Sequence, residues 1–187
     1  MELMDTIEKR KSYRAFDPVD ITDDMISEMM YAASRAPSCS NNQPWRFIFV
    51  RKKEVLDGLK DSLSEGNYWG LRASMIIALI SRPDLDCQID ERNYNLLDSG
   101  MAMGLMLLKA TEMGLATHPI AGFDQDLAKK ILEIPADYQL LPLILVGRKS
   151  ENPLLLKKEY HRESEKKRSE RKPMEDVMAW DMFDFND

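Results

Sequence analysis

The chain has 187 residues, of which 44% are hydrophobic and 31% are charged, and its formal net charge is −6. This length and composition predict a single domain with a substantial core, over residues 1–187. The acidic balance argues against nucleic-acid binding, which usually requires a basic excess on one face. The chain has only two cysteines and two histidines and no Cys-x-x-Cys pair, so no metal site is expected.

The amino-terminal segment is charged from its second residue and lacks the apolar stretch of a signal peptide. The longest apolar run is far shorter than the ~18 residues that a membrane span needs. A low cysteine content fits a reducing compartment. We therefore expect a cytoplasmic protein that does not bind a membrane.

Helices and strands alternate along the chain, which predicts an α+β fold with a central mixed or antiparallel sheet flanked by helices. Apolar periodicity and turn residues set the expected bounds. Helices are expected over residues 4–11, from an N-cap at Thr22 to residue 35, over residues 54–63 and 93–113, and from a cap at Asp124 to residue 132. Strands are expected over residues 46–50, 75–80, 116–121 and 140–146.

The expected helix at residues 93–113 is apolar almost all round, with Gly114 as its C-terminal stop. A helix without a polar face must be buried on every side. In a chain of this size, a dimer interface is a natural place to bury it.

After Gly147 the composition changes, and twelve of the sixteen residues from 157 to 172 are charged. Such a segment cannot form a core of its own. The chain then ends with Trp180, Phe183 and Phe185, which would be unfavourable to leave exposed together. We therefore expect residues 148–187 to form an arm that docks on a partner subunit.

Four polar clusters are candidates for binding. The segment from Arg10 to Arg14 carries three cations and could grip a phosphate, or simply complement a helix dipole. Residues 36–45 place amides and hydroxyls between two prolines, which suits the edge of a heterocycle or an ordinary turn. Gly122 could bring backbone N–H groups near a ligand or belong to a plain strand-to-helix loop. The cations around Arg171 could assist the other clusters in binding, or they could be a solvated charge run.

The order and spacing of these clusters resemble the nitroreductase family over essentially the whole chain. The matching segments are Arg10-Lys11-Ser12-Tyr13-Arg14-Ala15-Phe16, Ala36-Pro37-Ser38 through Asn42-Gln43-Pro44-Trp45, Asp98-Ser99-Gly100 with Glu112-Met113-Gly114-Leu115, Pro119-Ile120-Ala121-Gly122-Phe123, and Arg171-Lys172-Pro173.

The resemblance implies a nitroreductase-like, intertwined homodimer with two FMN sites at the subunit interface. Arg10, Ser12 and Arg171 would hold the FMN phosphate, with Lys11 adding contacts. Arg14 would reach the pyrimidine end, where a fixed cation stabilises the anionic reduced flavin. The rest of the implied set is Pro37, Ser38, Ser40 and Asn42, the last three from the other subunit, and Pro119, Ala121 and Gly122, the last two near flavin N5.

The sequence also departs from the family pattern. Some relatives carry a glutamate at the position of Ala121, and some carry a flavin-contacting lysine where this chain has residues 67–72. Asn67 is our choice for that contact, and Lys167 or Arg168 could assist Arg171.

Other residues near the implied site have less specific interpretations. Cys39 is interpreted as a small residue that fills space, with a redox-active role as the alternative. Tyr68 and Trp69 either stack over the substrate or pack. We expect His118 to be a strand residue with a satisfied partner.

The implied function is two-electron transfer from NADH or NADPH through flavin N5 to an electron-poor small molecule, a nitroaromatic or a quinone. One shared site implies ping-pong kinetics. No catalytic side chain is expected, because the flavin carries the chemistry. Without a Gly-x-Gly-x-x-Gly fingerprint, the nicotinamide donor would bind transiently.

Three alternatives stay open at this point. The chain could be a specialised relative that catalyses dehalogenation, flavin fragmentation or a biosynthetic redox step. It could be a non-catalytic FMN-binding protein. It could also be a dimeric scaffold without flavin, whose basic clusters are only surface.

Overall fold

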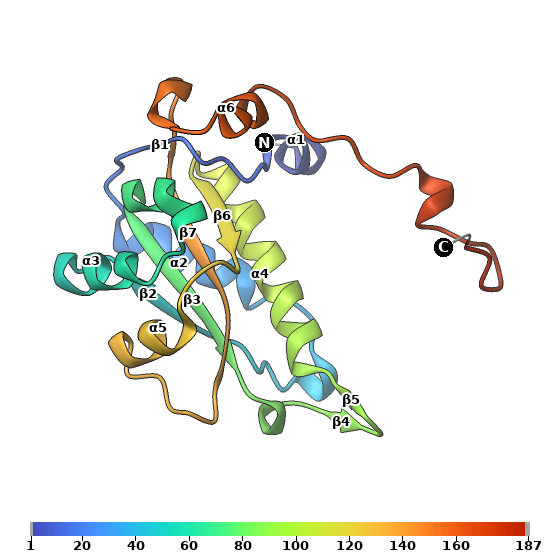
Figure 1. Cartoon of the computed structure of the whole chain (residues 1–187). Helices are drawn as coiled ribbons and strands as arrows, with labels where there is room; N and C mark the ends of the chain where they lie inside the picture. Colours follow the sequence, from blue (N-terminus) through green and yellow to red (C-terminus); the bar gives the residue numbers. More distant parts are fainter. Residues whose placement is uncertain (1, 186–187) are drawn as a thin grey trace.

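The computed structural model describes residues 2–185. Five strands form one sheet in which every pairing is antiparallel: β1 (Phe16–Asp17), β2 (Arg46–Val50), β3 (Met75–Ser81), β6 (Ala116–Ile120) and β7 (Gln139–Lys149). The order is β1-β7-β3-β2, and β6 pairs with β7 (Figure 1). The α+β class expected from the sequence is therefore confirmed.

Six α-helices surround this sheet: α1 (Leu3–Lys9), α2 (Asp23–Ala33), α3 (Lys53–Asp61), α4 (Asn95–Glu112), α5 (Gln125–Ile131) and α6 (Glu159–Lys166). A separate hairpin, β4 (Gln88–Ile89) with β5 (Arg92–Asn93), projects from the body beside the start of α4 (Figure 1). None of the helices within residues 2–185 is long and apolar enough to cross a membrane.

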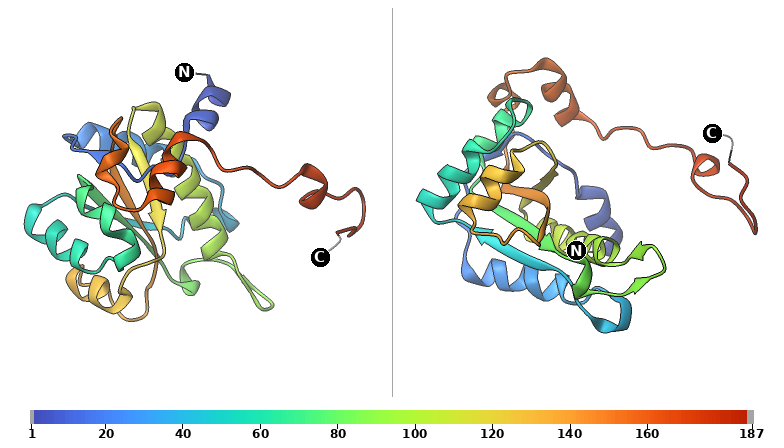
Figure 2. Two further views of the ribbon diagram at one scale, coloured as in Figure 1. Left: turned by 45° about the horizontal axis from the view of Figure 1, so that its top comes forward. Right: turned by 60° about the horizontal axis from the view of Figure 1, so that its bottom comes forward.

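The central strand β3 is buried on both faces, as its unbroken apolar run predicts. Its alternate residues enter different cores, because successive side chains of a strand point to opposite faces. Met75, Ile77 and Leu79 pack with α2 and α4. On the other face, Ile76, Ala78 and Ile80 pack with α3 and α5. The sheet is thus the middle of three layers (Figure 2).

Local signals set several helix ends where the sequence places them. The Thr22 hydroxyl accepts from the N–H of Met25 at 3.2 Å, and the Asp124 carboxylate accepts from the N–H of Leu127 at 3.0 Å. Gly114 follows α4 with φ +79°, the left-handed conformation that a glycine adopts without strain.

The carboxy-terminal segment divides in two. β7 continues to Lys149, and residues 150–166 pack on the body, with Leu156 and His161 buried. The Tyr68 hydroxyl accepts from the backbone N–H of Lys157 at 2.8 Å. Residues 172–185 instead extend away from the body (Figure 2), with Trp180 and Phe183 80% and 79% exposed. Only this second part has the form of an arm.

Candidate functional site

A basic cleft of about 210 Å³ lies between the segment after α1 and the segment after α6. It brings together the four residues expected at the phosphate, Arg10, Lys11, Ser12 and Arg171, from opposite ends of the chain. The lining residues are Arg10, Lys11, Ser12, Arg14, Ser164, Arg168, Ser169 and Arg171. Sequence reasoning missed the two serines at 164 and 169, because they lie inside a charged run with no local motif.

Hydrogen bonds that span about 150 residues of sequence hold the two walls of the cleft together. Arg168 Nη2 donates to the carbonyl oxygens of Glu8 and Arg10 at 2.6 and 2.7 Å, which satisfies acceptors left free where α1 ends. Lys11 Nζ donates to the Glu165 carbonyl at 2.9 Å. Of the two candidate helpers for Arg171, Arg168 therefore lines the cleft and has a tethering role, whereas Lys167 does not line it.

Five basic side chains and no carboxylate line the cleft, although the Glu165 carboxylate behind it accepts from the Arg14 backbone N–H at 3.0 Å. Burial lowers the pKa of Arg10, and the charges of Arg168 and Arg171 lower it further. Within residues 2–185, neither Arg10 nor Arg171 forms a salt bridge. A bound dianion would relieve this repulsion and accept charge-assisted hydrogen bonds. The residues present therefore fit a phosphate group.

Arg14 connects the cleft to the face of the sheet. Its Nη1 donates to the Ser164 hydroxyl at 3.1 Å, and its guanidinium lies 5.9 Å from the ring centre of Trp69. Trp69 is only 2% exposed and belongs to the core, so it packs and is not available to stack on a substrate. Tyr68, whose hydroxyl contacts residues 157 and 158, also has a packing role.

His118 lies under Trp69, with ring centres 4.5 Å apart. Its Nδ1 lies 3.0 Å from the Tyr13 carbonyl oxygen, which confirms the expectation of a satisfied strand histidine. Burial lowers the pKa of His118 to about 4, against the raising effect of that hydrogen bond. The imidazole is therefore neutral at pH 7, with Nδ1 as the donor, and carries no charge toward the cleft.

Asn67 and Gly122 meet at the end of β6. Asn67 Nδ2 donates to the Gly122 carbonyl at 2.7 Å. A Cβ added at Gly122 would lie 2.7 Å from Ser64 Oγ and 2.8 Å from Asn67 Nδ2, so only glycine fits without a shift. Ala121 beside it is exposed and Pro119 is half-buried.

The third group of expected residues lies elsewhere in the same chain. Ser38, Ser40 and Asn42 belong to a loop held at the first turns of α4, where the backbone N–H of Cys39 donates to Asp98 at 2.7 Å. Lys9 and Lys11, by contrast, share a hollow with Thr111 and Gly114 at the end of α4. The 18 residues of α4 span about 27 Å. Within one chain the two groups therefore lie near opposite ends of α4.

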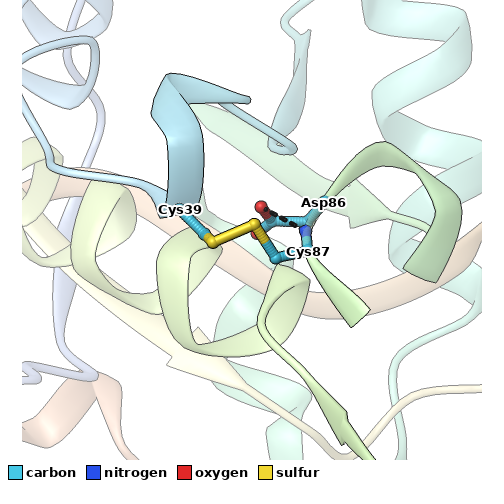
Figure 3. A group of neighbouring side chains, drawn as sticks. All are labelled: Cys39, Asp86 and Cys87. Atoms are coloured by element: carbon cyan, nitrogen blue, oxygen red, sulfur yellow. Dashed lines mark hydrogen bonds between the residues drawn. A yellow bond between two sulfur atoms is a disulfide. The ribbon is translucent and has the colours of Figure 1, made fainter. Parts of the chain in front are cut away.

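A disulfide joins Cys39 to Cys87, with their Cα atoms 5.9 Å apart (Figure 3). Cys39 is thus not merely a small space-filling residue. The disulfide could not be predicted from the sequence, because the two cysteines are 48 residues apart. Sγ of each cysteine and a carboxylate oxygen of Asp86 lie within 4.8 Å of one another. Because the sulfurs are bonded to each other, they are not thiolate ligands for a metal.

Two carboxyl groups lie beside the disulfide. Asp86 Oδ1 accepts from the N–H of Cys87 at 2.8 Å and from Asn42 Nδ2 at 3.3 Å. Burial raises the pKa of Asp98, the Cys39 N–H opposes that shift, and Asp86 reinforces it. The loop is therefore tied to α4 and to the hairpin through both its cysteine and its amide.

Fold and site together indicate a protein with an α+β sheet core and a basic, phosphate-sized cleft. The nitroreductase family model matches residues 7–68 and 65–148. Protein DrgA of Synechocystis is 25% identical over 81% of this chain and 86% of its own. NADH dehydrogenase of Thermus thermophilus is 24% identical over 92% of both.

Solved structures agree with these relatives. A nitroreductase family protein from Clostridium novyi has a TM-score of 0.75 and 27% identity, covering 82% of this chain and 88% of its own. An oxidoreductase containing FMN has a TM-score of 0.84 and 26% identity, covering 97% of this chain and 92% of its own. The chain belongs to the nitroreductase family.

Proposed function

We propose that this protein is an FMN-dependent oxidoreductase that passes two electrons from NADH or NADPH to an electron-poor small molecule, a nitroaromatic or a quinone. The basic cleft is the observation that carries the proposal, because five cations converge there and no carboxylate lines it. Relatives named NADH dehydrogenase and an oxidoreductase containing FMN support the donor and the cofactor.

In this proposal each cluster has one task. Arg10, Ser12 and Arg171 bind the FMN phosphate, with Lys11 beside them. Arg14, fixed between Ser164 and the Trp69 ring, supplies the cation for the pyrimidine end. The corner formed by Asn67, Pro119, Ala121 and Gly122 lies along the ring system. The bound FMN supplies the reversible two-electron chemistry, and the chain supplies orientation and charge.

We further propose a homodimer in which the loop bearing Pro37, Ser38, Ser40 and Asn42 completes the FMN site of the other subunit. The distance between this loop and the cleft within one chain supports that assignment. So does an apolar groove of about 470 Å³ that involves α1, α2 and α4. Exposed apolar residues on α1, α4 and the arm would be covered: Leu3, Met4, Ile7, Leu96, Leu97, Met174, Val177, Trp180 and Phe183.

Donor and acceptor would use one open face in turn, which gives ping-pong kinetics. The arrangement needs no charged histidine, since His118 is neutral at pH 7. NADH and NADPH are cytoplasmic reductants, so we place the protein in the cytoplasm.

Steady-state oxidation of NADH and NADPH by FMN-loaded protein, with a quinone and a nitroaromatic as acceptors, tests the proposed reaction. We expect parallel lines in double-reciprocal plots against acceptor. Intersecting lines would contradict a shared site. A flavin-loaded protein that oxidises neither nucleotide would instead indicate a non-catalytic FMN-binding protein.

A further inference from the structure

The Cys39–Cys87 disulfide joins two segments, the loop of residues 38–43 and the hairpin of residues 87–93. We propose that this disulfide is a reversible redox pair, and that its reduction by a dithiol loosens the loop and weakens FMN binding. The part that concerns FMN rests on the proposed function, which assigns Ser40 and Asn42 to the cofactor.

The residues assigned to the cofactor lie directly against the disulfide. Asn42 Nδ2 is 3.7 Å and Ser40 Oγ is 3.8 Å from the Sγ of Cys87. The same Asn42 amide also donates to Asp86 at 3.3 Å. A shift of Cys87 would therefore alter the contacts that position the Asn42 and Ser40 side chains.

The backbone of the loop is strained, so we expect it to relax when the disulfide is broken. Ser40, Asn41 and Gln43 have φ angles of 50°, 58° and 50°. This left-handed region is unfavourable for residues other than glycine, least so for asparagine. Such conformations persist only where the surroundings impose them. The remaining ties include the Cys39 N–H to Asp98 and the Gln43 N–H to the Ser38 hydroxyl at 3.0 Å.

The other side of the disulfide is weakly held. Residues 88–93 are all exposed, and the hairpin projects beside the start of α4 (Figure 1). Few buried contacts and a solvent-exposed backbone are the features of a segment that opens easily. Once its sulfur is released, Cys87 can therefore move away with the hairpin, and the loop is left with the hydrogen bond from the Cys39 N–H to Asp98 as its tie to α4.

The redox step balances with a dithiol as the reductant. One thiolate of the dithiol attacks a sulfur of the pair, forms a mixed disulfide and expels the other cysteine as a thiolate, which takes up a proton. The second thiol of the reagent then attacks the mixed disulfide and releases the first cysteine. Two electrons and two protons pass to the pair, and the dithiol leaves as its own disulfide.

Both cysteines are only half-buried, so a small dithiol can reach the bond. Disulfides are rare in reducing compartments, and those that occur there are transient, catalytic or redox-sensing. The cytoplasmic location proposed above therefore favours a reversible pair over a permanent link.

The test compares the full-length protein before and after treatment with dithiothreitol, with thiols counted by alkylation and mass spectrometry. We expect two free thiols after treatment, faster amide exchange in residues 38–44, and a Kd for FMN about tenfold higher. A double variant, Cys39→Ser with Cys87→Ser, should match the reduced protein and should not respond to dithiothreitol, since it has no cysteine left.

Two results would overturn the inference while FMN binding remains intact: thiols that do not appear under native conditions, or a reduced protein whose exchange and Kd match those of the oxidised protein. The second result would make the disulfide a static link only. If neither form bound FMN, the proposed function would fail together with the effect on FMN, and amide exchange in residues 38–44 would still decide whether reduction releases the loop.

Discussion

The arginines of the basic cleft have different roles. Arg168 donates through Nη2 to backbone carbonyls of the α1 segment, whereas the side chains of Arg10 and Arg171 make no hydrogen bond or salt bridge within residues 2–185. Charge that is not used within the chain is available for a ligand. We therefore assign the phosphate to Arg10 and Arg171, and the shape of the cleft to Arg168.

This assignment predicts that Arg171→Ala weakens FMN binding by about tenfold to 100-fold, because a charge-assisted hydrogen bond contributes roughly 1.5–3 kcal/mol. The measurement is an FMN titration followed by flavin fluorescence. Lys172→Ala is the matched control, since Lys172 is the next residue and does not line the cleft. An equal loss in both variants would indicate only a general effect of surface charge.

The lowered pKa of His118 predicts that the stability of the folded protein depends on pH. Its pKa is about 4 in the folded chain and near 6.5 when unfolded, so the unfolded state binds more protons between these values. Stability should be full above pH 6.5 and should fall as the pH drops toward 4. The loss at pH 5 should be about 2 kcal/mol.

Urea unfolding of the wild type and of His118→Gln at pH 7 and pH 5 measures this effect. Glutamine can still donate to the Tyr13 carbonyl but does not titrate. We expect a clearly smaller loss of stability between the two pH values in the variant. An identical loss in both proteins would assign the pH dependence to other groups.

At the scale of elements, the close packing between the end of β6 and the segment before β3 requires a glycine at position 122. Gly122→Ala should displace Asn67 and Ser64, destabilise the protein by about 1–3 kcal/mol and weaken FMN binding. Thermal unfolding and FMN titration measure the two effects. Gly66→Ala is the control, because a Cβ there meets nothing within 4 Å. Full stability and FMN affinity in Gly122→Ala would contradict the close packing.

The elements that could be predicted from the sequence are those whose signals are local. β2 matches its expected bounds, and β3 and α4 lie within two residues of theirs, because apolar periodicity is a property of neighbouring residues. α6 was missed, because its polar sequence becomes helical only with His161 buried against the body.

The parts of the candidate site that could be predicted from the sequence are likewise those with local signals. The motifs around Arg10 and Gly122 could be found in the sequence, and the structure places Arg10 in the basic cleft and Gly122 against Asn67. The disulfide and the tether made by Arg168 could not, because their partners are 48 and 158 residues away and no local pattern joins them.

At the scale of the whole molecule, the single chain leaves a large apolar surface uncovered on α1, α4 and the arm. The proposed dimer predicts that Trp180→Ala combined with Phe183→Ala raises the dimer dissociation constant at least about 30-fold, since truncated aromatic anchors commonly lose 2 kcal/mol or more. Light scattering across a dilution series measures it, with Asp184→Ala as the control. A wild type that is monomeric at every concentration would contradict the dimer.

The absorbance spectrum of the purified protein, after FMN is added and the excess removed by desalting, tests the central claim most directly. NADH or NADPH is then added without oxygen. We predict that the flavin band is retained and bleaches when the nucleotide is added. A protein that retains no flavin would contradict the FMN site, and Arg10, Ser12 and Arg171 would then be ordinary surface residues.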